Sequence, residues 1–331
     1  MSRTALLVVA ETREGLASPL TRELLGLARE LASGSGAEVD ALLIAKNDSA
    51  VQDLVAHGAD RVHLCVSPGA DEYEGELWVG IAEHVARELA PAAILAGHTP
   101  AGADLAPRLA FRLATAVAMG CVAVALQSGR LLFTRPCYGG NVRETVSMTV
   151  APAIATVKAG VGTATVDASR QGEVVRVAAP VIKPQARVVA REREAADSKS
   201  LEDARIIVAG GRGLDGPEGF RVLEALAALL GAAVGASRVP CDLGWCPHSW
   251  QIGLTGKTVT PDLYFAVGIS GAGHHMAGCG NARTIVAINT DPLAAIFRDA
   301  RFGVVGDYRK FVPALVEALN RQEIHEWLNR S

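Results

Sequence analysis

The stretch Pro261–Gly278, PDLYFAVGISGAGHHMAG, decides the fold of the second half of the chain. It joins an apolar run to a glycine-rich turn, and the adjacent His274 and His275 follow that turn. An apolar strand that ends in small residues brings backbone N–H groups to the edge of a sheet, where they can meet anionic or aromatic groups. The stretch therefore predicts a ligand site at the end of this strand.

A second glycine-rich turn stands upstream, after the apolar run 205–209. Gly211, Gly213 and Gly216 match the spacing GxGxxG, and Pro217 is suited to open a helix. In a dinucleotide fold, such glycines let a pyrophosphate approach the helix N-terminus. The motif alone also fits a tight strand-to-helix turn, so both interpretations stay open.

The next strand ends in Gly235-Ala-Ser-Arg238, without the carboxylate that holds a ribose in an NAD site. An unpaired guanidinium inside a strand rich in Ala and Val is costly, so we expect Arg238 at the mouth of the sheet. There it either stacks on a planar ligand or forms a surface ion pair with Asp242.

The segment Gly256-Lys257-Thr258 imitates the tail of an ATP-binding loop. That loop needs a glycine at position 251, which is Gln, so no ATP hydrolysis is predicted. Thr255 alone is compatible with a simple turn hydroxyl. His274 and His275 could fix the local backbone at a helix start, and they lack the neighbours of a metal site. The sequence shows no set of residues that could catalyse hydrolysis.

Strands and helices also alternate in the first half. Continuous apolar runs predict strands buried on both faces, at 5–10, 39–45, 61–66 and 92–96. Helices are expected from the Ser18-Pro19 cap onward and around 77–89. Strands separated by helices indicate a mostly parallel sheet in an α/β domain. From Cys121 to Val157, short alternating runs predict an antiparallel edge added to that sheet.

A charged stretch without apolar periodicity separates the two halves, and we predict a linker over 189–203. The expected domains are an N-terminal α/β domain over 1–188 and a doubly wound α/β domain over 204–331. The second domain has strands near 205–209, 232–236, 262–267, 283–288 and 303–305.

Composition narrows the class of protein. The 331 residues are 50% hydrophobic, which is enough for two cores. A net charge of −3 gives no reason to expect nucleic acid or an anionic membrane as partner. The opening MSRTALLVVAE lacks the pattern of a secretory signal, and the longest apolar run, 113–126, is too short to span a bilayer. We therefore expect a soluble, cytoplasmic protein.

The six cysteines include no CxxC pair, which fits a reducing compartment. Cys241, Cys246 and His248 cluster in sequence, but they lack the second ligand pair of a structural zinc site. No metal is predicted.

Taken together, the motifs occur in a diagnostic order: GGRGL at 210–214, GASR at 235–238, QIGLTGK at 251–257, PDLY at 261–264, GISGA at 268–272, a histidine at 275, TIVAINTDP at 284–292 and GDYRKFVPAL at 306–315. This order resembles the electron transfer flavoprotein alpha subunit family. In the first half, LLVVAE at 6–11, ARELA at 28–32 and RPCYGGN at 135–141 resemble that family's first domain more loosely.

The resemblance implies that the second, Rossmann-like domain binds FAD. Arg238 would lie over the isoalloxazine ring, Thr255 would hydrogen-bond its N5 edge, and His275 would donate to the region of its C2 carbonyl. The implied cofactor site comprises Arg212, Ser237, Arg238, Gln251, Ile252, Gly253, Leu254, Thr255, Ser270, Gly271, Ala272, Gly273, His274, His275, Asn289, Asp307 and Tyr308.

Two positions depart from the family pattern. His274 and Leu254 stand where the family commonly has Gln. Losing an amide donor and adding a titratable imidazole beside the flavin is expected to shift its reduction potential or make the potential depend on pH.

The resemblance also implies a partner and a role. The chain would form a heterodimer with an electron transfer flavoprotein beta subunit through its first domain. It would shuttle electrons from acyl-CoA or related dehydrogenases of fatty acid beta-oxidation to a quinone reductase or another acceptor, as a redox carrier and not a stand-alone enzyme. Two alternatives stay open: an electron-bifurcating complex that oxidises NADH through its beta subunit, and an NADP-dependent oxidoreductase in which Arg238 meets a 2′-phosphate. The intact Arg238, Thr255 and His275 argue against a non-redox protein that has lost its flavin.

Overall fold

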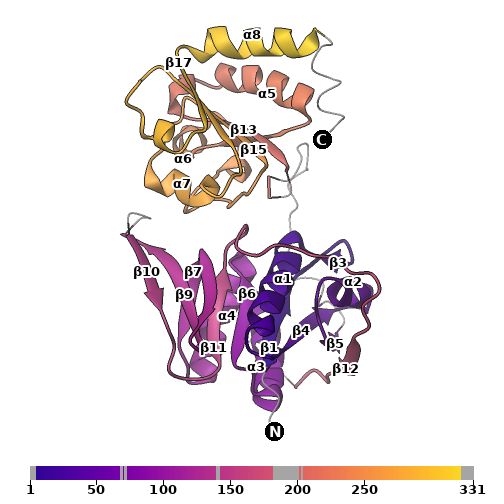
Figure 1. Ribbon diagram of the computed structural model, residues 1–331. Helices are drawn as coiled ribbons and strands as arrows, with labels where there is room; N and C mark the ends of the chain where they lie inside the picture. The colour runs from indigo at the N-terminus through magenta and orange to yellow at the C-terminus, as the bar shows by residue number, and fades with distance from the viewer. Residues whose placement is uncertain are drawn as a thin grey trace. The chain divides into compact units, whose positions relative to one another are not determined.

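The computed structural model describes residues 5–67, 70, 73–138, 142–181, 201–202 and 204–321. The chain divides into two compact units, whose described parts are residues 5–181 and residues 201–321 (Figure 1). Apart from residues 201 and 202, the predicted linker 189–203 lies outside the described residues. The domain boundaries 1–188 and 204–331 therefore stay predictions.

The first unit is built on a seven-stranded sheet in the order β12-β5-β4-β1-β6-β11-β7. All six neighbouring pairs run parallel. The strands are β1 (Ala5–Ala10), β4 (Glu38–Ala45), β5 (Arg61–Val66), β6 (Ala93–Gly97), β7 (Val117–Cys121), β11 (Ala153–Val157) and β12 (Glu173–Arg176). Every residue of the central strands β1, β6 and β11 is buried, as expected for a sheet covered on both faces. The predicted α/β class is confirmed.

In the part of the first unit that the structure describes, four helices cover this sheet. Helices α1 (Pro19–Ser33) and α2 (Val51–Ala56) pack in one core, while α3 (Gly75–Leu89) and α4 (Pro100–Arg112) pack in the other. The side chain of Ser18 caps α1 by accepting a hydrogen bond of 3.1 Å from the backbone N–H of Thr21. A short hairpin, β2 (Thr12–Arg13) with β3 (Leu16–Ala17), lies between β1 and α1.

The antiparallel strands form a sheet of their own. The strands β8 (Ala123–Gln127), β9 (Arg130–Cys137) and β10 (Val142–Val146) pair in the order β10-β9-β8. Antiparallel pairing is confirmed, but these strands do not extend the parallel sheet as expected. Phe133 and Val124 are buried in the core that also contains α1, so the small sheet packs by one face.

The second unit has a five-stranded parallel sheet in the order β14-β13-β15-β16-β17. The strands are β13 (Ile206–Gly210), β14 (Ala233–Ala236), β15 (Leu263–Val267), β16 (Ile285–Asn289) and β17 (Phe302–Val305). The helices are α5 (Glu218–Leu230), α6 (Arg238–Asp242), α7 (Gly273–Cys279) and α8 (Tyr308–Asn320), with three short 3-10 turns, η2 (Arg212–Leu214), η3 (His248–Trp250) and η4 (Ala295–Arg298).

Helices lie on both faces of this sheet (Figure 1). One core holds residues of α5 and α8, and Cys279 of α7 belongs to the core on the opposite face. Neighbouring residues of β13, Ile207 and Val208, point into different cores because side chains alternate along a strand. The doubly wound architecture is confirmed. No helix in the described parts of either unit is long and apolar enough to cross a membrane.

Candidate functional site

A cavity of about 250 Å³ opens in the second unit beside the carboxyl ends of its strands. The first strand of that sheet, β13, lies between the second and the third, β14 and β15. The chain passes from β13 to β14 on one side and then crosses back to β15 on the other side, and open α/β sheets bind ligands outside the carboxyl ends at such a switch point. The lining residues follow β14 or β15; they are Arg238, Gln251, Ile252, Gly253, Leu254, Thr255, His274 and His275. All of them belong to the predicted site.

Arg238 is the cation of the cavity. It begins α6, directly after Ser237, whose backbone N–H donates to the carbonyl of Gly210 at 2.9 Å. Its Nε atom lies 3.0 Å from Oδ2 of Asp242, and its side chain is 66% exposed. Arg238 can therefore pair with Asp242 in the absence of a ligand and still turn to a planar ligand when one binds. An exposed ion pair contributes only about 1 kcal/mol or less to stability, so a ligand can replace it.

Thr255 lies on a tight loop closed by backbone hydrogen bonds. Lys257 N–H donates to the carbonyl of Gln251 at 2.8 Å, and Gly253 N–H donates to the carbonyl of Lys257 at 3.1 Å. The side-chain amide of Gln251 donates to the hydroxyl oxygen of Thr255 at 3.0 Å. The hydroxyl hydrogen of Thr255 has no acceptor within the described ranges, so it can donate to a ligand in the cavity.

His275 is held by two hydrogen bonds inside the protein. Its Nδ1 lies 3.0 Å from the carbonyl oxygen of Ile252, and its Nε2 lies 2.9 Å from the hydroxyl of Tyr264. A carbonyl only accepts, so Nδ1 carries the hydrogen. Burial lowers the pKa of His275 to about 4, so the ring is neutral at pH 7. Nε2 is then unprotonated and accepts from the hydroxyl of Tyr264.

This arrangement differs from the expected donation of a ring N–H to the flavin, which would require the bond to Ile252 to break. The bond to Ile252 ties the ring to the loop that lines the cavity. The N–H of Leu254 also donates to the carbonyl of His274 at 2.7 Å. A Cβ on Gly278 would lie 2.4 Å from the backbone nitrogen of Gly253, so α7 and the loop touch backbone to backbone. A direct contact between His275 and a cofactor stays a prediction.

Tyr264, whose hydroxyl bonds to His275, is not among the predicted site residues. It is fully buried, and burial raises the pKa of its hydroxyl well above the ordinary value, so the hydroxyl stays protonated. The only signal in the sequence was a phenol inside an otherwise apolar strand.

Leu254 and His274 lie at the cavity in the positions where the sequence departs from the family pattern. Both are exposed, with Leu254 at 47%. A ligand there would meet an aliphatic side chain and a solvated imidazole. The effect on a reduction potential stays a prediction.

The glycines of the GxGxxG motif serve a contact between two turns. The N–H of Gly211 donates to the carbonyl of Val267 at 2.9 Å, and that of Gly213 donates to the carbonyl of Gly268 at 3.0 Å. A Cβ on Gly211 would lie 2.2 Å from the carbonyl oxygen of Gly268. The close contact between the two turns therefore explains why glycine stands at positions 211 and 213. The N–H groups of both residues already have partners inside the protein. Arg212, between them, is exposed.

The other predicted site residues lie along the same edge of the sheet but outside the lining of the cavity. The amide of Asn289 donates to the carbonyl of Ile269 at 2.9 Å. Asp307 caps α8 by accepting from the N–H of Arg309 at 2.9 Å. The hydroxyl of Tyr308 donates to the carbonyl of Leu214 at 2.9 Å, so it serves packing. Cofactor contacts stay predictions for these residues and for Arg212, Ser237, Ser270, Gly271, Ala272 and Gly273.

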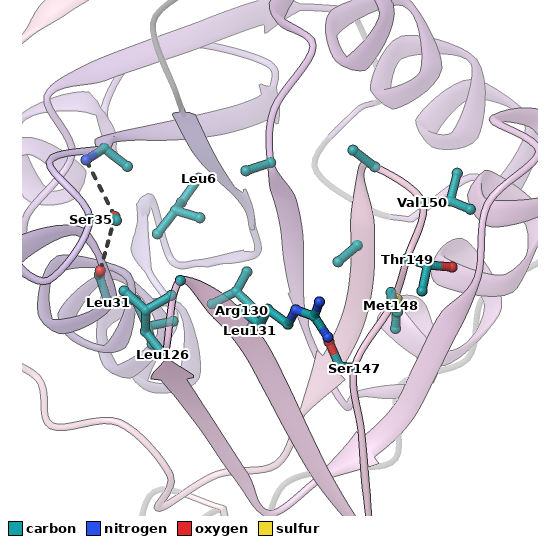
Figure 2. A pocket seen from close by; sticks show the side chains of 15 residues that line it. Leu6, Leu31, Ser35, Leu126, Arg130, Leu131, Ser147, Met148, Thr149 and Val150 are labelled. Atoms are coloured by element: carbon teal, nitrogen blue, oxygen red, sulfur yellow. Dashed lines mark hydrogen bonds between the residues drawn. The ribbon is translucent and has the colours of Figure 1, made fainter.

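A second cavity, of about 270 Å³, lies in the first unit and differs in character. Figure 2 shows its aliphatic lining, in which Leu6, Leu31, Leu126 and Leu131 are prominent and Arg130 is the charged side chain. It opens at the amino ends of β1, β6 and β11, opposite to the edge where α/β sheets bind ligands. It is therefore not the candidate site. Within the described ranges, no group of three or more His, Cys, Asp or Glu side chains could hold a metal ion.

The residues that line the cavity of the second unit suit a planar ring with polar edges. The guanidinium of Arg238 favours negative charge, and the Thr255 hydroxyl offers a donor. Ile252 and Leu254 offer apolar surface to the faces of a ring.

Comparison with known proteins identifies two matching family models. An electron transfer flavoprotein domain matches residues 6–182, and an electron transfer flavoprotein FAD-binding domain matches residues 200–280. The electron transfer flavoprotein subunit alpha of Thermoanaerobacterium thermosaccharolyticum is 41% identical over 320 residues, covering 95% of this chain and 97% of that protein. The electron transfer flavoprotein subunit alpha of Bacillus subtilis is 41% identical over 324 residues, which cover 97% of this chain and 98% of that protein. Protein FixB of Clostridium saccharobutylicum is 37% identical over 314 residues, covering 93% and 94%.

Proposed function

Because the chain belongs to the electron transfer flavoprotein alpha family and contains that family's FAD-binding domain, we propose that it carries one FAD as the alpha subunit of a heterodimer with a beta subunit. The observation that most supports this proposal is the cavity between Arg238, Thr255 and the loop that His275 holds. A cytoplasmic location stays a prediction.

FAD, when bound, accepts and releases electrons at its isoalloxazine ring. The residues of this chain would bind that ring and tune its charge. Arg238 would stabilise negative charge on the ring, and Thr255 would donate its hydroxyl hydrogen to an acceptor of the ring. The Ile252–His275 and Leu254–His274 hydrogen bonds hold the loop in place before the cofactor arrives.

We propose that the heterodimer receives electrons from an acyl-CoA or related dehydrogenase and delivers them to a quinone reductase or another acceptor. The close identity to alpha subunits over nearly the full chain supports a carrier role. A second candidate is the alpha subunit of an electron-bifurcating complex, since two proteins named FixB are 37% and 35% identical to this chain. An NADP-dependent oxidoreductase has less support, because Gly211 and Gly213 donate their N–H groups inside the protein.

The decisive experiment is co-expression with the beta subunit, followed by purification and counting of FAD per heterodimer. The proposal expects a yellow complex with one FAD bound in this chain. Two FAD per heterodimer and reduction by NADH would favour the bifurcating candidate. A colourless complex that cannot be reconstituted with FAD would refute both.

Variants then locate the cofactor. Arg238→Ala and Thr255→Val should each weaken FAD retention, while Arg221→Ala, which removes an exposed arginine from α5, should not. Equal FAD retention in all three variants would place the cofactor elsewhere.

A further inference from the structure

Two thiols of the second unit lie in contact beneath its surface. The Sγ atoms of Cys241 and Cys246 are 3.5 Å apart, and the residues are 2% and 9% exposed. The intervening Asp242, Leu243 and Gly244 are exposed, so the pair lies directly under a surface turn. Neither cysteine lines the cavity described above.

The turn that ends α6 brings these thiols together. Gly244 has a left-handed φ of 70°, and its N–H donates to the carbonyl of Cys241 at 2.9 Å. The N–H of Trp245 donates to the carbonyl of Pro240, also at 2.9 Å. These bonds form a Schellman motif, in which a glycine reverses the chain at a helix end. Backbone hydrogen bonds therefore set the proximity of the thiols without a metal or a covalent link.

The surroundings favour one thiol as nucleophile. The hydrogen bond from Cys246 lowers the pKa of Cys241, and the same bond raises the pKa of Cys246. The thiolate is the reactive form of cysteine, so Cys241 is the first to react and Cys246 is the resolving thiol. The Sγ of Cys241 also lies 3.6 Å from the carbonyl oxygens of Ser237 and Pro247, which keep the side chain in place.

We propose that Cys241 and Cys246 are an oxidative modification site at which hydrogen peroxide closes a reversible intramolecular disulfide. The Cys241 thiolate attacks peroxide, the O–O bond breaks, and a sulfenic acid and hydroxide form. Cys246 then attacks the Cys241 sulfur, the S–O bond breaks, the S–S bond forms, and hydroxide leaves. The two thiol protons combine with the two hydroxides, so two thiols are oxidised and one peroxide is reduced to two waters.

The two sulfurs must move closer for this step. An S–S bond is about 2.05 Å long, so the Sγ atoms, now 3.5 Å apart, must approach by about 1.5 Å. The disulfide would join Cys241, on the helix that begins with Arg238, to Cys246, which lies beyond the end of that helix. Oxidation therefore acts on the element that presents the cation to the cavity.

The test uses the purified complex of the full chain with its beta subunit. The reduced complex is treated with hydrogen peroxide, free thiols are alkylated, and the protein is digested with trypsin. Both cysteines and no others lie in the peptide Val239–Lys257, which follows from the positions of Arg and Lys. The expected product is this peptide without alkyl groups and two hydrogens lighter, and prior treatment with dithiothreitol should restore double alkylation.

Variants provide the controls. Cys246→Ser leaves no resolving thiol, so Cys241 should be trapped as a sulfenic acid by dimedone, whereas the wild type should not. Cys137→Ser removes a partly exposed thiol of the first unit and should behave as the wild type. The proposal is overturned if Val239–Lys257 stays doubly alkylated while Cys137 is oxidised, or if Cys241 in the wild type proceeds to sulfinic acid instead of the disulfide.

Discussion

The neutral ring of His275 links the stability of the second unit to pH. Burial lowers its pKa from the ordinary 6.5 to about 4. The unfolded chain therefore binds a proton in this pH window that the folded chain does not. The neutral ring makes its full contribution to the free energy of unfolding above pH 6.5, and this contribution is lost progressively as the pH falls toward 4. Its size is about 3 kcal/mol.

We expect this dependence to disappear in His275→Gln. Urea unfolding at about pH 7.5 and about pH 5 should show a larger loss of unfolding free energy in the wild type than in the variant. His274→Gln, at the exposed neighbouring position, should keep the wild-type dependence. Identical pH slopes for the wild type and His275→Gln would contradict this account.

The guanidinium of Arg238 is expected to set the reduction potential of a bound flavin. Removing a cation next to a ring costs about 1–2 kcal/mol of stabilisation of the reduced, negatively charged form. Arg238→Ala should therefore lower the two-electron potential by roughly 20–40 mV. Potentiometric titration of the flavin measures this shift. Arg238→Lys should recover part of it, and an unchanged potential in Arg238→Ala would exclude a contact between this side chain and the ring.

At the scale of elements, the contact between α7 and the loop 251–257 depends on a missing side chain. A Cβ on Gly278 would lie 2.4 Å from the nitrogen and 2.6 Å from the Cα of Gly253. Gly278→Ala should push the loop away from α7 and reduce FAD affinity at least tenfold, a loss of about 1.4 kcal/mol or more.

The control is Gly244→Ala, where an added Cβ meets no atom within 4 Å. That variant is expected to lose about 1 kcal/mol of stability through its left-handed φ and to keep its cofactor affinity. FAD titration of both variants by fluorescence quenching measures the difference. Equal affinities would show that the contact between Gly278 and Gly253 does not shape the cavity.

Elements were predictable where the signal is local. Strands such as β1 and β6 are short apolar runs, and α1 carries a Ser-Pro start. The same signal, Thr99-Pro100, starts α4, although no helix was predicted there; Thr99 caps it by accepting from Gly102 N–H at 3.0 Å. The separate antiparallel sheet could not be predicted, because its attachment depends on which distant strands pair.

The candidate site also combines features that the local sequence predicts with features that it does not. Its lining residues were recognisable as motifs, since each motif is a short stretch at a strand end. The partner of His275 was not recognisable, because Tyr264 lies inside β15 and meets the ring only after α7 packs on the sheet. Contacts between elements come from the packing of the whole unit and leave no pattern in the local sequence.

For the whole molecule, two units with separate cores predict domain-sized fragments on limited proteolysis. The predicted linker 189–203 contains Arg191, Arg193 and Lys199. Trypsin at low concentration should cut there first and release two resistant fragments, identified by mass. A variant with all three residues changed to Gln should be cut more slowly. First cuts within 5–181 or 204–321 would contradict the predicted domain boundaries.

The lining of the cavity comes from separate segments, around Arg238, 251–255 and His274-His275. A cofactor that touches all of them connects these segments to one another. A ligand that binds only the folded chain raises the free energy of unfolding by about 2.7 kcal/mol when its concentration is a hundredfold above its Kd. Heat tolerance should therefore rise with the FAD supply. In a cell short of FAD, we expect proteases to degrade the empty chain first.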